Sequence, residues 1–142
     1  MKNILLLGAT GSIGKSVLSV ISQNDHKFNL YGISFNKNIV EGDEIIKNFS
    51  PSFVHINNKE AFEKQSHKKS CNFSNGDDSL KDLIKNEDID IIVCATSGFA
   101  GLKAAFIAAS TGKKILLANK ESIVAGGDLI PVSYTHLTLP TK

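Results

Sequence analysis

The sequence predicts an α/β fold in which helices cover both faces of a doubly wound, mostly parallel sheet. Short apolar runs, typical of strands that are buried on both faces, alternate with segments of helical periodicity. A glycine-rich turn joins the first apolar run to the first helical segment. The chain has 142 residues, of which 42% are hydrophobic. That length is enough for one well-packed core, so we expect a single domain.

The first three elements form the clearest unit. Lys2–Leu7 is a compact apolar run that predicts a buried strand. After the glycine turn, apolar residues recur at helical spacing until Asn24 and Asp25 interrupt them, which predicts a helix of about three turns. Residues 29–35 predict a second strand. The connection between the two strands is long enough only for a crossover helix, so we expect the strands to be parallel.

The alternation continues along the chain. We predict further helices over residues 40–48, 59–68, 79–86 and 98–109, and further strands over residues 52–56, 90–95 and 114–118. Residues 66–78 are rich in Ser, Asn, Gly and Lys and are expected to form a surface connection. The last segment, residues 131–142, carries two of the three prolines and has neither helical nor strand periodicity.

Composition and charge exclude several classes of function. The formal charge is +2, and the lysines are scattered among acidic residues, so we expect neither nucleic acid nor a membrane surface as a partner. No apolar run reaches the roughly 18 residues of a membrane span. Cys71 and Cys94 lack the spacing of a disulfide framework or a zinc site, and we expect Cys94 to be a core residue. These features predict a cytoplasmic protein.

Gly8, Gly11 and Gly14 have the spacing of a dinucleotide-binding turn, and they stand between the first strand and the first helix, as such a turn must. Glycines there permit a tight turn, the approach of the backbone to a pyrophosphate, and close packing of helix on strand. Thr10 and Ser12 can add hydroxyl donors. The alternative is a turn that merely joins strand to helix. The pattern favours a Rossmann-like nucleotide-binding domain.

The residues after the second strand indicate which nucleotide is bound. An enzyme that prefers NAD usually has Asp or Glu there, which binds both ribose hydroxyls. This chain has Asn36, Lys37 and Asn38 instead. No carboxylate would repel a 2′-phosphate, and Lys37 can pair with one, so the local chemistry favours NADP. The alternative for Lys37 is an ordinary solvated lysine.

Two further turns follow later strands and are expected at the same edge of the sheet. Residues 96–101 form a small-residue turn that could admit a cofactor, or that could simply allow tight packing of the next helix. Residues 119–122 are four consecutive polar residues. A helix cap with a solvated charge pair would explain Ser122 and Glu121, but it does not require Asn119 and Lys120.

Three segments together resemble the 1-deoxy-D-xylulose-5-phosphate reductoisomerase family. They are GATGSIG at residues 8–14, NKN at residues 36–38 and LLANKES at residues 116–122, in the family's order and approximate spacing. The resemblance covers about residues 1–130. It implies an NADPH-binding domain of an enzyme that rearranges and reduces 1-deoxy-D-xylulose 5-phosphate to 2-C-methyl-D-erythritol 4-phosphate, in the non-mevalonate isoprenoid pathway. It also implies a divalent metal, Mg²⁺ or Mn²⁺.

The resemblance implies a role for each matching residue. Thr10, Gly11, Ser12 and Ile13 would hold the pyrophosphate and the adjoining ribose. Lys37 and Asn38 would hold the 2′-phosphate, and Asn36 would belong to the same cofactor-binding turn. The family usually has Gly at the position of Asn36, and Asn tolerates the left-handed backbone that Gly permits. Asn119 and Glu121 would lie beside the cofactor, and Lys120 would point to the substrate.

The resemblance also sets expectations for the rest of the enzyme. The family's metal ligands, a D-S-E segment and a later Glu, follow the NKES motif and do not occur here. We expect residues 1–130 to be the NADPH-binding domain, residues 131–142 to be a non-native tail, and the catalytic metal-binding and C-terminal domains to be absent. The acidic pairs at residues 77–78 and 87–88 are expected to be solvated and away from the cofactor. The fragment is expected to be inactive and the complete enzyme a homodimer.

Two other functions stay open. An NADP-dependent oxidoreductase of the aspartate-semialdehyde dehydrogenase type would share the glycine turn, but it needs a nucleophilic Cys. Cys94 is predicted to point into the sheet, and Cys71 lies in a polar connection. The second is a non-catalytic nucleotide-sensing domain, whose output is a conformational change. The downstream reading frame would distinguish these functions from the reductoisomerase.

Overall fold

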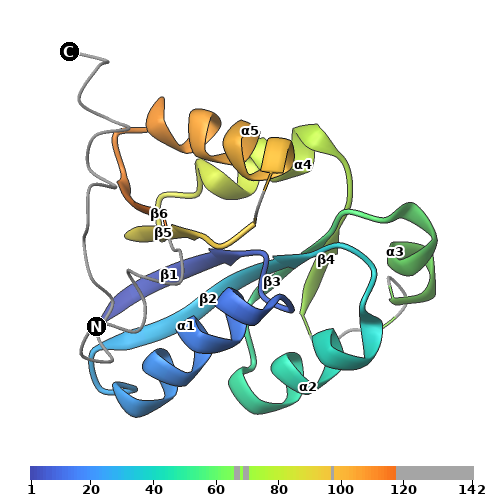
Figure 1. Ribbon diagram of the computed structural model, residues 1–142, viewed down its shortest axis with the longest axis horizontal. Coiled ribbons are helices and arrows are strands. Elements are labelled where there is room, and N and C mark those ends of the chain that lie inside the picture. The colour runs from blue at the N-terminus through green and yellow to red at the C-terminus, as the bar shows by residue number, and fades with distance from the viewer. Residues whose placement is uncertain (66–67, 69–70, 97, 118–142) are drawn as a thin grey trace.

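The computed structural model describes residues 1–65, 68, 71–96 and 98–117. Within these residues, six parallel strands form one sheet in the order β4-β3-β2-β1-β5-β6 (Figure 1). The strands are β1 (Lys2–Leu7), β2 (Phe28–Phe35), β3 (Phe53–Ile56), β4 (Asn72–Ser74), β5 (Ile91–Cys94) and β6 (Lys114–Leu117). The helices are α1 (Ser12–Gln23), α2 (Ile39–Phe49), α3 (Lys59–Gln65), α4 (Asp77–Ile84) and α5 (Gly98–Ala109). The predicted Rossmann-like, doubly wound fold is confirmed.

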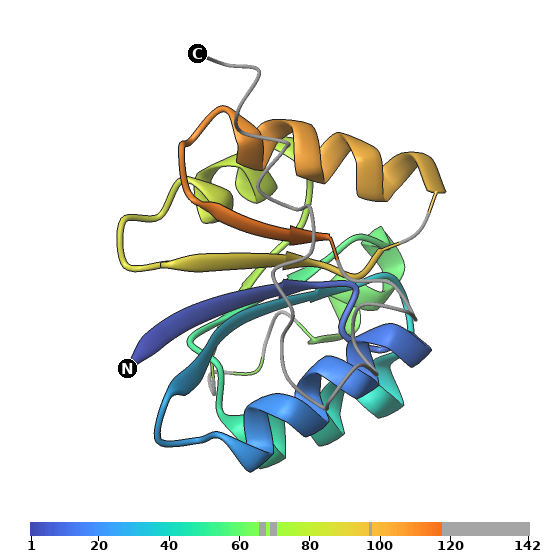
Figure 2. The same ribbon diagram turned by 60° about the vertical axis from the view of Figure 1, so that its left-hand side comes forward.

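The helices divide between the two faces of the sheet. Helices α1, α2 and α3 cover one face, and α4 and α5 cover the other (Figure 2). Strand β1 supplies both cores, because Ile4 and Leu6 join the cluster under α1–α3, whereas Leu5 and Leu7 join the cluster under α4 and α5. A strand that is buried on both faces has no polar alternation. This is why the apolar run predicts β1 with its observed ends.

Strand β4 was not predicted, and the expectation of a surface connection over residues 66–78 is wrong at this point. Asn72, Phe73 and Ser74 pair in parallel with β3 at the edge of the sheet. The strand is three residues long and has an exposed or half-buried pattern, so it lacks the apolar signal of a central strand. It forms because backbone groups pair across the sheet, which local hydropathy does not report.

The other elements differ from the prediction mainly at their ends. Helix α2 starts one residue early because Asn38 Oδ1 accepts a hydrogen bond from the Glu41 backbone N–H at 3.2 Å, which caps the helix. Helix α3 ends at Gln65, so Lys68 lies outside it. Helix α4 starts at Asp77 instead of residue 79. Residue 118, predicted to end the last strand, lies outside the described residues.

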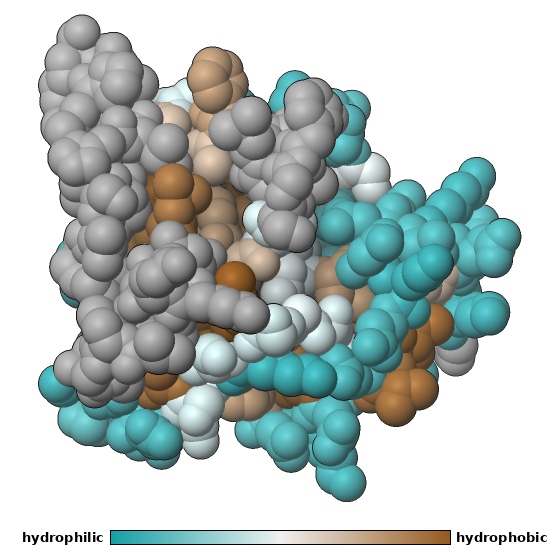
Figure 3. All heavy atoms as spheres, viewed as in Figure 1, coloured by the Kyte–Doolittle hydropathy of each residue, from teal (hydrophilic) through white to brown (hydrophobic). Residues whose placement is uncertain are grey.

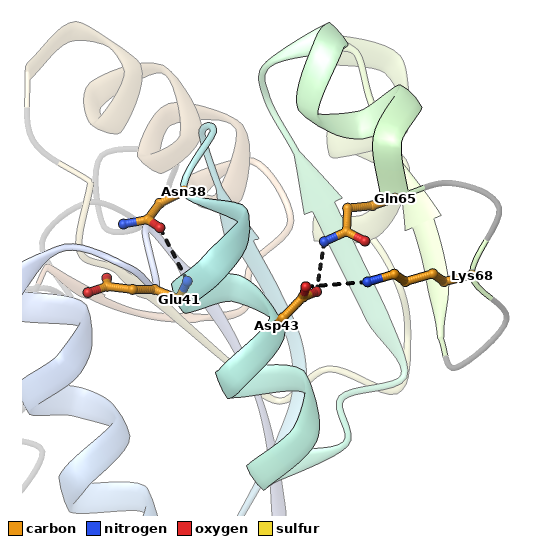
Figure 4. A network of polar contacts seen from close by, with 5 residues as sticks. All are labelled: Asn38, Glu41, Asp43, Gln65 and Lys68. Atoms are coloured by element: carbon orange, nitrogen blue, oxygen red, sulfur yellow. Dashed lines mark hydrogen bonds and ion pairs between the residues drawn. The ribbon is translucent and has the colours of Figure 1, made fainter.

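A polar network fastens α2 to the end of α3 (Figure 4). The Asp43 carboxylate accepts a hydrogen bond from Gln65 Nε2 at 2.7 Å and pairs with Lys68 Nζ at 3.3 Å. Hydrophilic residues cover the right-hand side of the molecule in Figure 3, where Figure 1 places α3. This agrees with the prediction that α3 is a polar helix.

Candidate functional site

The two halves of the sheet diverge at β1, which lies between β2 and β5. In open α/β sheets, ligands bind at the carboxyl ends of the strands where the strand order reverses. Here that position is marked by Leu7, which is paired with Ser34 of β2 on one side and with Cys94 of β5 on the other. The glycine turn follows directly after Leu7, so the predicted phosphate site and the switch point of the sheet coincide.

The start of the turn is held by Ser34. The backbone N–H groups of Gly8 and Ala9 donate to the Ser34 carbonyl oxygen at 3.0 and 2.8 Å, and Ser34 Oγ lies 3.1 Å from the Gly8 nitrogen. The Ser34 side chain is buried. Ser34 was not predicted as a site residue, although a hydroxyl at the end of an apolar strand is a detectable signal. Ser34 fixes the start of the turn, and the backbone N–H groups that follow Ala9 are left for a ligand.

Gly8 and Gly14 are required by the protein's own packing. Gly8 has a φ of +87°, and a Cβ there would lie 2.6 Å from Thr96 Oγ1. A Cβ on Gly14 would lie 2.3 Å from the Gly8 carbonyl oxygen and 2.6 Å from that of Ala9. Gly8 therefore allows the turn to pack against the end of β5. Gly14 allows α1 to pack against the turn.

Gly11 differs from the other two glycines. Among the described residues other than its chain neighbours, a Cβ there would come within 4 Å of the Gly8 carbonyl oxygen alone, at 3.9 Å, so this part of the chain leaves room for a side chain. Gly11 is the N-cap of α1, which has no side-chain cap and no acidic residue in its first turn. The positive end of the helix dipole is thus exposed beside a residue without a side chain. This arrangement fits a pyrophosphate, whose close approach a side chain at residue 11 would obstruct.

The structure brings together the predicted residues that it describes. Thr10 and Ile13 are half-buried and Gly11 and Ser12 are exposed, all directly after β1. The exposed triplet at residues 36–38 directly follows β2, the neighbouring strand. Lys37 has no ion pair with a described acidic side chain. The predicted residues Asn119, Lys120 and Glu121 lie outside the described residues.

Asn36, where the resemblance implies Gly, has no backbone strain. Among the described residues other than glycine, only Ser50 has a positive φ. The left-handed conformation that Asn was expected to tolerate is therefore not used at Asn36. Its carbonyl oxygen accepts a hydrogen bond from the Asn58 backbone N–H at 3.0 Å, which ties the end of β2 to the loop after β3.

A cleft of about 470 Å³ opens at the carboxyl edge of the sheet. Residues from three strands, from two helices and from the connections after β2, β3, β4 and β5 line it: Leu7, Ser34, Asn36, His55, Asn57, Gly76, Asp77, Leu80, Thr96 and Ala104. Asp77, expected to be solvated and away from the cofactor, is exposed but lines this cleft, because β4 returns the chain to the carboxyl edge just before α4 begins. Asp88, of the other acidic pair, lies at the opposite end of β1, where its carbonyl oxygen accepts a hydrogen bond from Asn3 Nδ2.

Comparison with known proteins identifies the family. The family model described as 1-deoxy-D-xylulose 5-phosphate reductoisomerase matches residues 4–127. The chain belongs to this reductoisomerase family. Relatives include the reductoisomerases of Clostridium novyi, 41% identical over 137 residues, and of Vesicomyosocius okutanii, 37% identical over 131 residues. These alignments cover 92% and 91% of this chain but only 35% and 34% of the relatives, so the chain spans about a third of their length.

Solved structures of the family agree with the fold. A reductoisomerase crystal structure in complex with NADPH, fosmidomycin and magnesium superposes with a TM-score of 0.80 at 30% identity, covering 99% of this chain and 34% of that one. The Zymomonas mobilis reductoisomerase in complex with NADPH has a TM-score of 0.75 at 29% identity, covering 95% of this chain and 36% of that one. Both likenesses are consistent with the reductoisomerase family and the Rossmann-like sheet.

Cys94 of this reductoisomerase family member is a core residue, as predicted. Burial raises the pKa of its thiol to about 12, so the thiol stays protonated near neutral pH, the form that is a poor nucleophile. Among the described residues, no group of three or more His, Cys, Asp or Glu side chains is placed to hold a metal ion. No helix in that same part of the chain is long and apolar enough to cross a membrane.

His55 is a buried histidine that the sequence analysis missed. It lies on β3, lines the cleft, and places Nδ1 2.9 Å from Ser74 Oγ of β4. Burial lowers the pKa of His55, and the charge of Asp77 acts in the opposite direction. Because β4 was not predicted, no signal in the sequence paired His55 with Ser74.

The lowered pKa of His55 predicts an acid-sensitive fold. The unfolded chain takes up the proton near the ordinary pKa, about 6.5, whereas the folded chain takes it up only at lower pH. The contribution of neutral His55 to the free energy of unfolding is therefore complete above about pH 6.5. It is lost as the pH falls toward the lowered pKa of His55 in the folded chain. We expect His55→Asn, which can still reach Ser74, to reduce the difference in urea midpoint between about pH 8 and about pH 5. An unchanged difference would contradict this role.

Proposed function

We propose that this chain is the NADPH-binding part of a 1-deoxy-D-xylulose 5-phosphate reductoisomerase. The observation that carries the proposal is the open, uncapped start of α1 at Gly11, next to a β2 end that has Lys37 and no carboxylate. Thr10, Gly11, Ser12 and Ile13 hold the pyrophosphate and the adjoining ribose. Lys37 and Asn38 hold the 2′-phosphate, and Asn36 belongs to the same cofactor-binding turn. The NADPH complexes of similar reductoisomerases support this assignment.

The residues after β6 complete the proposed site. NADPH, when bound, supplies the hydride for reduction of the rearranged sugar phosphate. Asn119 and Glu121 lie beside the cofactor in this proposal, and the Lys120 ammonium offsets negative charge on 1-deoxy-D-xylulose 5-phosphate. The complete enzyme forms 2-C-methyl-D-erythritol 4-phosphate in isoprenoid synthesis, and we propose that it is a cytoplasmic homodimer.

The metal belongs to another part of the enzyme in this proposal. Mg²⁺ and Mn²⁺ need several oxygen ligands, and the described residues offer no such cluster. A magnesium ion is present in similar reductoisomerase structures, of which this chain covers about a third. We therefore assign the carboxylate ligands to the two thirds of the family's length that this chain does not match, and we expect this chain alone not to turn over the substrate.

The test of the proposed function is a titration with both nicotinamide nucleotides. NADPH and NADH are added to the purified chain, and binding is followed by the fluorescence of the reduced nicotinamide. We expect NADPH to bind and NADH to bind more weakly, because only NADPH carries the 2′-phosphate. Equal affinity for the two nucleotides, or binding of neither, would refute the proposal.

We further propose that residues 1–130 form the nucleotide-binding domain and that residues 131–142 are a non-native tail. Deleting residues 131–142 should leave the urea midpoint unchanged and the free energy of unfolding within about 0.5 kcal/mol of the full chain, because the segment has no periodic apolar face. NADPH affinity should also be unchanged. A clear loss of stability would show that the segment belongs to the native fold.

A further inference from the structure

An ion pair joins the first turns of α1 and α2, which lie side by side on one face of the sheet (Figures 1 and 2). Lys15 Nζ lies 2.6 Å from Glu41 Oε1. Lys15 directly follows Gly14 of the phosphate turn, and Glu41 is the acidic residue in the first turn of α2. The side chain of Glu41 is 31% exposed and that of Lys15 is 57% exposed. The carboxylate is thus the less solvated member of the pair.

Glu41 stands next to the proposed 2′-phosphate residues. Asn38 Oδ1 accepts the Glu41 backbone N–H at 3.2 Å, and Lys37 directly precedes Asn38. Figure 4 shows the Glu41 side chain extending away from Asp43, on the side of α2 that faces α1. A phosphate monoester carries a charge of about −1.5 to −2 near neutral pH, so an uncompensated carboxylate here would repel it. Lys15 is the cation that is paired with this carboxylate.

We propose that Lys15 sets the preference for a 2′-phosphorylated nucleotide indirectly, by neutralising Glu41. The inference rests on the proposed function, since it concerns the same site. Lys15 is a positioning residue in this account: it contacts Glu41 and not the phosphate. An acidic residue near the end of β2 is the usual device by which Rossmann domains select NAD. Glu41 does not occupy that position but lies farther along the chain, in the first turn of α2, and its ion pair with Lys15 keeps the site compatible with a 2′-phosphate.

A double-mutant cycle tests this proposal. Lys15→Ala, Glu41→Gln and the double variant are titrated with NADPH and NADH, and with 2′,5′-ADP and 5′-AMP as probes that lack nicotinamide. Lys15→Ala should weaken NADPH and 2′,5′-ADP about three- to tenfold and leave NADH and 5′-AMP nearly unchanged. The double variant should recover the unmutated affinity for NADPH, because no carboxylate is then left to repel the phosphate.

The alternatives give different results. If Lys15 contacted the phosphate directly, the double variant would stay as weak as Lys15→Ala, and the proposal would be overturned. An equal loss for NADH would show a structural role and would overturn it too. The matched control is Lys47→Ala, which removes an exposed lysine in the last turn of α2 and should change neither the NADPH nor the NADH affinity. The effect should shrink at about 1 M salt, where the screening length is about 3 Å.

Failure of this proposal is distinguishable from failure of the proposed function. An unmutated chain that binds neither nucleotide contradicts the proposed function itself. An unmutated chain that prefers NADPH while Lys15→Ala keeps the same preference contradicts only the role of the ion pair. Urea midpoints of all variants show whether each one is folded under the conditions of the titration.

Discussion

Gly14→Ala should destabilise the domain by about 3 kcal/mol, a large part of the stability of a chain this size. The added Cβ would lie 2.3 Å from the Gly8 carbonyl oxygen, 2.6 Å from the Ala9 carbonyl oxygen and 2.7 Å from the Ala9 carbonyl carbon. All three atoms are backbone, so no side chain can rotate away. Either α1 moves off the sheet or the phosphate turn deforms. Urea denaturation followed by circular dichroism measures the loss.

Gly11→Ala is the matched control for that experiment. Among the described residues other than its chain neighbours, the nearest atom to its added Cβ is the Gly8 carbonyl oxygen, 3.9 Å away, so the free energy of unfolding should fall by less than about 1 kcal/mol. NADPH affinity should nevertheless drop at least about tenfold, because the new methyl group enters the space of the pyrophosphate. Equal stability losses for the two variants would show that the close packing of Gly14 is not what the fold requires. Unchanged NADPH binding by Gly11→Ala would show that the pyrophosphate does not bind at this turn.

Lys37→Ala should lower the affinity for NADPH about 10- to 150-fold, which corresponds to the loss of one charged hydrogen bond of about 1.5–3 kcal/mol. Lys37 is exposed and has no described ion-pair partner, so it can meet a 2′-phosphate without first breaking another contact. NADH, which lacks that phosphate, should bind with nearly the same affinity as before. Fluorescence titration with each nucleotide gives the ratio of the affinity of the variant to that of the unmutated chain, once for NADPH and once for NADH.

Two further variants sharpen the result for Lys37. Lys37→Arg keeps the charge and should keep most of the preference for NADPH. Lys47→Ala removes an exposed lysine at the far end of α2 and should have no effect. If Lys37→Ala weakens NADPH and NADH equally, Lys37 shapes the turn and does not recognise the 2′-phosphate.

Local sequence patterns predict those elements whose structure is determined by the residues of the segment itself. The apolar run of β1 and the helical spacing of α1 report the burial of those segments themselves. The glycine spacing predicts the turn, because a side chain on Gly8 or Gly14 would clash with atoms within the turn or beside it. Asn36, Lys37 and Asn38 follow β2, as predicted, and a residue that follows a parallel strand lies at the edge of the sheet where ligands bind in such folds.

The patterns fail where a contact joins distant segments. Strand β4 has no apolar signal and exists only through its pairing with β3. Because β4 was missed, Asp77 was misplaced and the contact between His55 and Ser74 was not foreseen. The expected use of a left-handed Asn36 was also unnecessary, since the backbone of that turn is set by its bond to Asn58.

The sequence by itself determined the parallel α/β class, the glycine turn between β1 and α1, and the absence of an acid directly after β2. Each is a property of a short segment, set by hydropathy period, by glycine or by charge. Only the tertiary structure decided that Ser34 holds the turn, that Asp77 and His55 line the cleft, and that Lys15 meets Glu41. Those pairs depend on the order of the strands and on the packing of helices against one face, and periodicity within a segment carries no information about which distant segment becomes its neighbour.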